Sequence, residues 1–164
     1  MPITSEQLAA SGSEEAIQRA MLNEIALVVR PTWPLVDLIY HIPNGGSRGS
    51  NPRDAKIQGA KMVAAGQKKG TPDLCLPIPK QYYAALYIEM KRPKDGALSL
   101  DQKKRISMLS QAFNFVAVID DWRIGTQLVL DYMSMSDHNQ FREKYAIHHR
   151  GDFPAIFDPS GFFK

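Results

Sequence analysis

The fold of this chain is decided by residues 70–91, which read GTPDLCLPIPKQYYAALYIEMK. Two apolar runs follow each other in this stretch, and Asp73 opens the first of them. Side chains alternate across a strand, so we expect Glu89 and Lys91 on one face of the second run. If the two runs pair as neighbouring strands, Asp73 and Glu89, the acidic pair, share a hard cation, with Lys91 beside the oxygen that the cation polarises.

The composition is that of one globular domain with one core, because the 164 residues are 44% hydrophobic and 23% charged. No apolar window is long enough to span a bilayer and the first residues do not resemble a signal peptide, so we expect a cytoplasmic protein without a membrane partner. The single cysteine, Cys75, is expected to be a buried thiol. A net charge of +3 and a pI near 9.0 permit a nucleic-acid partner without requiring one.

Upstream of the central stretch, we expect residues 1–10 to be a flexible lead, followed by a helix. Ser11 lies three residues before Glu14, as in a capping box, and apolar residues then recur at helical spacing until two prolines end the pattern. Glu14 continues the apolar stripe of this helix. It is either a carboxylate that interacts favourably with the helix dipole or one that reaches into the same cavity as the acidic pair.

The next segment is predicted to contain a strand and a turn-rich loop. Residues 36–42 form the strand, and the loop that follows includes Asn44 and Arg48. Its glycines let the backbone approach a phosphate, which Arg48 is able to pair with, although an ordinary turn explains the same composition.

Lysines gather on both sides of the central stretch. A helix is predicted from Asn51 to about Ala65, and Lys68 and Lys69 follow it. A phosphate chain that passes the acidic pair would meet these cations, unless they are only solvated surface charges. Lys103 and Lys104, off the apolar stripe of a later helix, are also placed to contact a nucleic-acid backbone.

That later helix opens with a capping-box pattern at residues 99–102. Gln102 either returns a hydrogen bond to the cap or places its amide at the mouth of the acidic pair, where it orients a water or a phosphate. The wholly apolar residues 115–119 predict a strand in the middle of a covered sheet, and Asp121 is expected to cap a last helix that runs to about Met133.

Residues 135–164 carry six aromatic residues and three histidines, too many aromatics for a plain disordered tail. This segment packs back on the domain, pairs with a second subunit or stacks on bases, and the sequence does not choose between these. His148 and His149 are adjacent, a spacing that is unusual for zinc ligands.

Five features, in this order, resemble the VRR-NUC family, a branch of the PD-(D/E)XK nuclease superfamily. They are Glu14 at a helix start, Asn44-Gly45-Gly46, Gly70-Thr71-Pro72-Asp73-Leu74, Ile88-Glu89-Met90-Lys91 and Leu98-Ser99-Leu100-Asp101-Gln102. The similarity covers residues 11–134, the expected nuclease domain, and leaves residues 135–164 as a C-terminal extension. Thr71 before the Pro-Asp pair is the one departure within these motifs.

The resemblance implies an α/β, restriction-endonuclease-like core, with a mixed central sheet of about four strands flanked by helices. It implies a Mg²⁺- or Mn²⁺-dependent DNA endonuclease, similar to phage and bacterial enzymes that cut branched or junction DNA as homodimers. Carried over by position, the resemblance makes Asp73 and Glu89 metal ligands, Glu14 a ligand directly or through water, Lys91 the residue that positions or activates the attacking water, and Gln102 a supporting polar contact.

Two other functions are considered. One is a binding module that keeps the fold and recognises DNA branches without cutting them, although Asp73, Glu89 and Lys91 are all intact, for which such a module has no physical need. The other is a metal-independent hydrolase that uses Cys75 or a serine, but the sequence has no nucleophile elbow and no spaced His/Asp partner.

Overall fold

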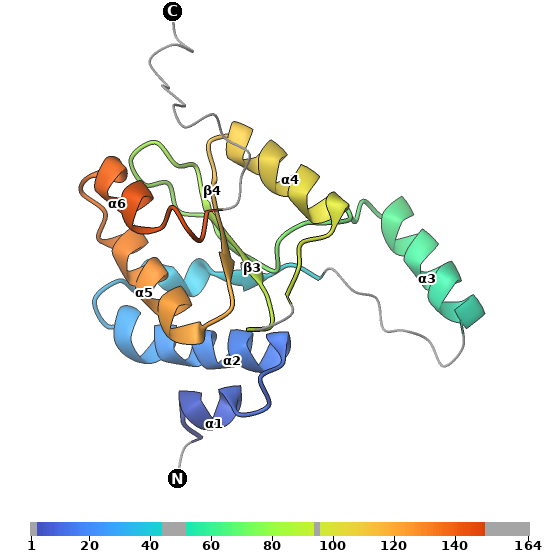
Figure 1. Ribbon diagram of the computed structural model, residues 1–164, viewed down its shortest axis with the longest axis horizontal. Coiled ribbons are helices and arrows are strands. Elements are labelled where there is room, and N and C mark those ends of the chain that lie inside the picture. The colour runs from blue at the N-terminus through green and yellow to red at the C-terminus, as the bar shows by residue number, and fades with distance from the viewer. Residues whose placement is uncertain (1–2, 44–51, 94–95, 150–164) are drawn as a thin grey trace, which may run out of the picture.

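A four-stranded mixed sheet forms the centre of the molecule (Figure 1). The computed structural model describes residues 3–43, 52–93 and 96–149. The strands lie in the order β1 (Tyr40–His41), β2 (Leu74–Leu76), β3 (Leu86–Met90) and β4 (Phe115–Ile119). The β1–β2 and β2–β3 pairs are antiparallel and the β3–β4 pair is parallel. The predicted α/β class with a mixed sheet is therefore confirmed.

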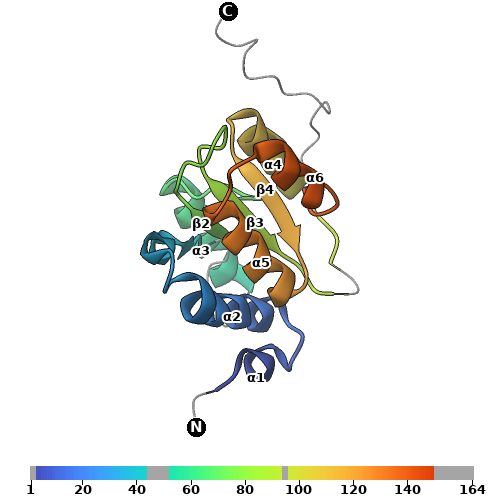
Figure 2. The ribbon, with the colours of Figure 1, turned by 90° about the vertical axis from the view of Figure 1, so that its left-hand side faces the viewer.

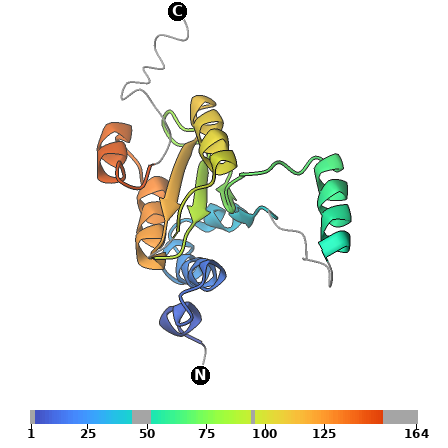
Figure 3. The same ribbon diagram turned by 45° about the vertical axis from the view of Figure 1, so that its right-hand side comes forward.

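Helices cover both faces of the sheet. They are α1 (Ser5–Ala9), α2 (Glu14–Glu24) with its π-helical continuation η1 (Ile25–Val29), the 3-10 helix η2 (Pro34–Leu38), α3 (Pro52–Ala64), α4 (Leu100–Gln111), α5 (Trp122–Met133) and α6 (His138–Lys144). α4 and α5 lie on opposite sides of the sheet, and α3 stands apart from the body (Figure 3). None of the helices among the described residues has the length and apolar character that a bilayer crossing requires.

The main core lies between the sheet and the layer of α2 and α5, which Figure 2 shows with α5 crossing in front of the strands. Ile88 and Met90 of β3 belong to this core, as the alternation along the strand predicted. Gly125 lets α5 approach α2 closely, because a Cβ at this position would lie 2.2 Å from the sulfur of Met21. A side chain at this position would force Met21 to move, so the glycine inside α5 suits the close packing of the two helices.

Two expectations for the N-terminal segment are wrong. Residues 1–10 are not simply a flexible lead, because Thr4 caps α1 and forms a capping box with Gln7. Ser13, not Ser11, caps α2, its side chain accepting a backbone N–H of the first turn. Both capping residues have extended backbone angles, which a side chain needs in order to reach back to the helix.

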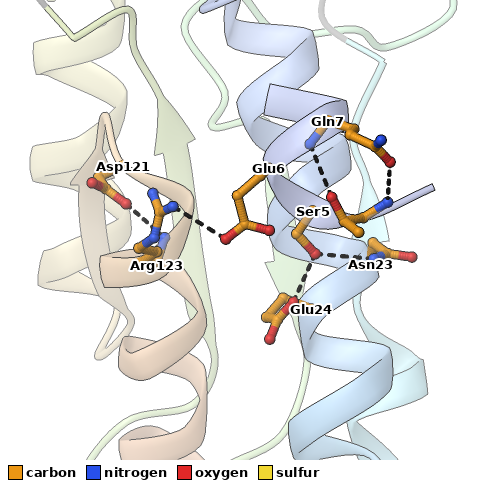
Figure 4. Close-up of polar contacts among 8 residues, drawn as sticks. Ser5, Glu6, Gln7, Asn23, Glu24, Asp121 and Arg123 are labelled. Atoms are coloured by element: carbon orange, nitrogen blue, oxygen red, sulfur yellow. Dashed lines mark hydrogen bonds and ion pairs between the residues drawn. The ribbon is translucent and has the colours of Figure 1, made fainter. Parts of the chain in front are cut away.

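Helix α1 is fixed to the body by side chains on two other helices (Figure 4). The Ser5 hydroxyl donates to a carboxylate oxygen of Glu24 at 2.7 Å and accepts from the Asn23 amide at 3.0 Å. Arg123, on α5, lies 3.2 Å from the Glu6 carboxylate. The N-terminal helix thus connects α2 and α5 at the base of the core.

The strand expected at residues 36–42 is much shorter. Pro34 is the first residue of the 3-10 helix η2, and its fixed φ suits that helix. Val36 lies on this helix and its side chain is buried in the core, so its apolar character reflects packing of the helix and not a strand. Only Tyr40 and His41 remain as strand β1.

Strand β4 lies at the end of the four-strand order, so the expectation that it lies mid-sheet is wrong. It is largely buried because α4 and α5 pack against it from opposite sides of the sheet, and the segment after α6 lies along its outer edge. The Val118 N–H donates to the His148 carbonyl at 2.8 Å, and Ala117 forms a bridge with His149. This pairing satisfies backbone groups that an open edge would expose.

Helix α6 packs back on the domain, one of the three arrangements considered for the C-terminal segment. Phe141 and Tyr145 are buried in the main core, and the Tyr145 hydroxyl donates to Asp131 at 2.6 Å. The His149 ring stacks on Phe115 with ring centroids 4.8 Å apart, which gives this histidine a packing role. The aromatic residues from 150 onward lie outside the described residues.

Candidate active site

Asp73 and Glu89 lie opposite each other where β2 and β3 meet. Leu74 pairs with Ile88, and continuing this antiparallel register by one residue places Asp73 opposite Glu89. Directly opposed residues share a face of the sheet, with their Cβ atoms about 5 Å apart. The Met90 N–H donates to the Asp73 carboxylate at 2.8 Å, which holds that side chain over β3. The structure therefore brings the acidic pair together.

Glu89 is an ionisable group in a nearly closed environment, with 1% of its surface exposed. Its Oε1 atom accepts two hydrogen bonds, one from the amide of Gln102 and one from Lys91, whose Nζ lies 2.8 Å away. Lys91 is itself only 8% exposed. Among the described residues, nothing donates a hydrogen bond to the buried Oε2 atom. The carboxylate is thus satisfied on one oxygen only.

The pKa of Glu89 is raised to about 7. Burial is the main cause, since it penalises the charged form, and the nearby charge of Asp73 raises the pKa further. The hydrogen bond and charge of Lys91 act in the opposite direction, and Glu14 adds a smaller upward contribution. At neutral pH the pair therefore carries less negative charge than two ordinary carboxylates, and a cation would be needed to keep both ionised.

Glu14 lies in the first turn of α2, behind the cap Ser13, and is half-buried. The negative charge of Glu14 is the smallest of the causes that raise the pKa of Glu89. Within the described ranges, however, no three Asp, Glu, His or Cys side chains gather closely enough to form a metal cluster. The acidic pair is the compact group, and Glu14 acts on it at longer range.

The residues fit a hard divalent cation. All the candidate ligands are carboxylate oxygens, and the Oε2 atom of Glu89 is buried without a hydrogen-bond donor among the described residues. Mg²⁺ keeps several waters and takes one or two protein carboxylates, which matches a compact group of two. Asp73 and Glu89 are therefore suited to hold Mg²⁺ or Mn²⁺.

Gln102 makes the capping contact considered for it, and its amide also reaches the acidic pair. Its Oε1 accepts the Ser99 N–H at 2.9 Å, which completes the capping box of α4. Its Nε2 donates to Glu89, so the amide points at the acidic pair. The first turn of α4 is thereby joined to β3.

Gly70 is a residue of this site whose role the sequence reasoning missed. Its φ of +73° is unfavourable for other residues, and a Cβ here would lie 2.3 Å from the backbone of Asp101. The chain entering β2 therefore contacts the first turn of α4 directly, next to Gln102. A glycine three residues before the candidate aspartate Asp73 was the available signal.

The same contact brings two lysine pairs to one corner of the molecule. Lys68 and Lys69 immediately precede Gly70, and Lys103 and Lys104 immediately follow Gln102. All four lysines are exposed. The loop residues Asn44 and Arg48, also predicted to contact nucleic acid, lie outside the described residues.

The comparisons with known proteins concern the sequence and the fold. The sequence model of the VRR-NUC domain matches residues 22–120, which is more than half of the chain. A solved structure described as a VRR_NUC domain protein is 26% identical, with a TM-score of 0.61, and the match covers 76% of this chain and 90% of that chain. None of the curated proteins searched matches the chain. Sequence and fold thus point to the same family independently.

Proposed function

The chain belongs to the VRR-NUC family of nuclease domains, and on that premise we propose that it is a divalent-metal-dependent DNA endonuclease that hydrolyses phosphodiester bonds. One observation carries the proposal. Glu89 is buried beside a second carboxylate and beside Lys91, and one of its oxygens has no donor among the described residues. An acidic pair of this kind is costly to the fold, and a bound cation offsets that cost.

Asp73 and Glu89 would hold the ion, with Glu14 close enough to contribute through its charge or through a water. A bound Mg²⁺ or Mn²⁺ supplies charge neutralisation at the phosphate and lowers the pKa of an attacking water. The protein's own part is to fix the two carboxylates. The Met90 N–H does this for Asp73, and the amide of Gln102 does it for Glu89.

Lys91 supplies hydrogen-bond donors beside the carboxylates. An ammonium group has three N–H donors, and the ion pair with Glu89 uses one of them. In this proposal the other N–H groups donate to the attacking water and to a phosphate oxygen. Because Lys91 is held in a nearly closed environment, we propose that it orients the water and offsets negative charge that develops on the phosphate.

DNA is the proposed substrate, with branched or junction DNA as its favoured form, and the enzyme is proposed to act as a homodimer. The four exposed lysines around Gly70 support a phosphate backbone as partner. A two-fold dimer would place two active sites at a fixed separation, which is how shape selects a junction. The mass of the protein in solution tests the dimer, and a monomer at assay concentration would exclude it.

The nuclease proposal is tested by incubating the protein with labelled linear, flapped and four-way DNA, with Mg²⁺ and with EDTA. Wild type should cut in Mg²⁺ only, and Asp73→Ala and Lys91→Ala should each cut at least about 100-fold more slowly. Glu15→Ala, an exposed carboxylate on the same helix turn as Glu14, is the matched control and should cut normally.

Circular dichroism of each variant shows whether it has folded. Cutting by wild type in EDTA, or unchanged cutting by either variant, would contradict the proposal. DNA binding without any cleavage in Mg²⁺ would instead favour the binding module.

A further inference from the structure

A row of three side chains crosses the sheet next to the acidic pair. The register places Tyr40 opposite Cys75, and Cys75 opposite Tyr87. Residues two apart along a strand share a face, so Cys75 lies on the same face as Asp73, and Tyr87 on the same face as Glu89. The two tyrosines and the acidic pair therefore belong to one surface of the sheet.

The cysteine in the centre of this row is buried, whereas the two tyrosines reach solvent. Tyr40 is 50% exposed and Tyr87 is half-buried. A hydrogen bond with Cys75 raises the pKa of Tyr40. Burial, followed by the charge and hydrogen bond of Cys75, raises the pKa of Tyr87 to about 12. Both phenols are therefore neutral at neutral pH, and both interact with the Cys75 thiol.

The sheet face that carries this row is covered only in part. Helix α4 packs against β4, and its Gln102 reaches Glu89 on β3. Tyr40 lies at the other end of the strand order, on β1, where the exposed fraction of its side chain shows that no helix of the described residues covers it fully. α3, the next helix along the chain, stands away from the body (Figure 3).

We propose that Tyr40 and Tyr87 form a stacking surface for an unpaired nucleotide base next to the phosphate that is cut. This inference rests on the proposed nuclease function. Two residues along a strand span about 7 Å, so Tyr87 and Glu89 are about 7 Å apart. This separation is similar to the distance from the phosphate to the base within one nucleotide. Aromatic side chains stack on any base, because every base has a π-face.

The surface also distinguishes between forms of DNA. A base inside an intact duplex is already stacked on its neighbours and must be unstacked before it reaches the tyrosines. A base in a single-stranded arm, a fork or a gap is available without that cost. The surface therefore selects substrates that have unpaired nucleotides at the cut.

The test measures binding in EDTA, so that it does not depend on cleavage. Fluorescence anisotropy with a labelled single-stranded oligonucleotide and with a blunt hairpin duplex compares wild type, Tyr40→Leu and Tyr40→Phe. Tyr40→Leu removes the aromatic plane, and should weaken single-strand binding about five-fold or more while changing duplex binding less than about two-fold. Tyr40→Phe keeps the plane and should bind single strands like wild type.

Tyr82→Leu is the matched control, since Tyr82 is 51% exposed but lies outside the four strands, with its ring against His138. It should bind both DNAs like wild type. Equal weakening of single-strand and duplex binding by Tyr40→Leu, no weakening, or wild type that does not bind single strands would each overturn the inference. Selective loss in a protein that proves unable to cut DNA would keep this surface and reject only the nuclease.

Discussion

Glu89→Gln should make the metal-free protein more stable at alkaline pH, although it removes a residue proposed to hold the metal. The carboxylate is 1% exposed and its pKa is raised from 4.5 to about 7. Between these two values the folded state binds more protons than the unfolded state, so the stability of wild type falls as pH rises through this window. An amide is neutral throughout and avoids that loss.

The size of the effect follows from the shift. A difference of about 2.5 pKa units, at about 1.4 kcal/mol per unit, corresponds to about 3 kcal/mol between pH 4 and pH 8. For a domain of this length, that is a change in Tm of roughly 6–12 °C. Because Asp73 is a principal cause of the shift, the difference between wild type and variant belongs to the acidic pair as a unit.

The assay is urea unfolding in EDTA, followed by circular dichroism at several pH values from 4.5 to 8. Wild type should lose about 3 kcal/mol relative to Glu89→Gln across this range, and Glu15→Gln, at an exposed position, should follow wild type. Millimolar Mg²⁺ at pH 8 should recover stability in wild type but not in Glu89→Gln. Parallel pH profiles for wild type and Glu89→Gln would refute the reasoning, since Glu89 would then be an ordinary carboxylate.

Three further predictions concern packing. Gly70 has a positive φ, and a Cβ there would lie 2.3 Å from the Asp101 backbone. Gly70→Ala should therefore cost about 1–3 kcal/mol in urea unfolding and slow DNA cleavage. Full stability and full activity of this variant would contradict the contact. Phe141→Ala should cost about 3–5 kcal/mol, and a loss under 1 kcal/mol would show that α6 is peripheral. Burial lowers the pKa of His149, so its contribution to stability should be lost as pH falls below about 6.5; a His149→Phe variant that keeps this acid sensitivity in thermal unfolding would exclude the residue as its source.

The elements predicted correctly are those whose signals are local. The alternation in residues 83–91 separates Ile88 from Glu89, and the structure places them on opposite faces of β3. The capping box at residues 99–102 is present as predicted, because both of its hydrogen bonds form within one helical turn. Patterns of this kind need no knowledge of the rest of the chain.

The errors arise where several local signals compete or where distant segments decide. Ser11 and Ser13 are both able to cap a helix, and the spacing alone does not show that Ser13 has the extended backbone and accepts the N–H of the first turn. The five apolar residues of β4 predict a buried strand, and the strand is largely buried. They do not predict that the segment at His148 pairs with the edge of the strand. Apolar content measures burial and does not identify what provides it.

The burial of Glu89 is the property of the candidate site that the sequence did not predict. The spacing of Asp73, Glu89 and Lys91 predicted that they form one group, yet nothing in that spacing indicates that Glu89 is the desolvated carboxylate. Its burial depends on the docking of α4, which follows from the missing side chain at Gly70. The contact of α4 with Gly70 and the reach of Gln102 to Glu89 therefore contribute to the burial that, together with the charge of Asp73, raises the pKa of Glu89.

The same arrangement divides the sheet face into two parts with different physical demands. Beneath the first turn of α4, Glu89 is shielded from water, which strengthens its interactions with Lys91 and with any bound cation. Toward β1, Tyr40 is 50% exposed, so the described helices do not fully cover this end of the face. A site that was covered throughout would exclude a polymer, and one that was open throughout would leave its carboxylates fully hydrated. Helix α4 covers the first part, and none of the described helices fully covers the second. This arrangement would suit the proposed nuclease, because Glu89 is desolvated while Tyr40 stays exposed beside it.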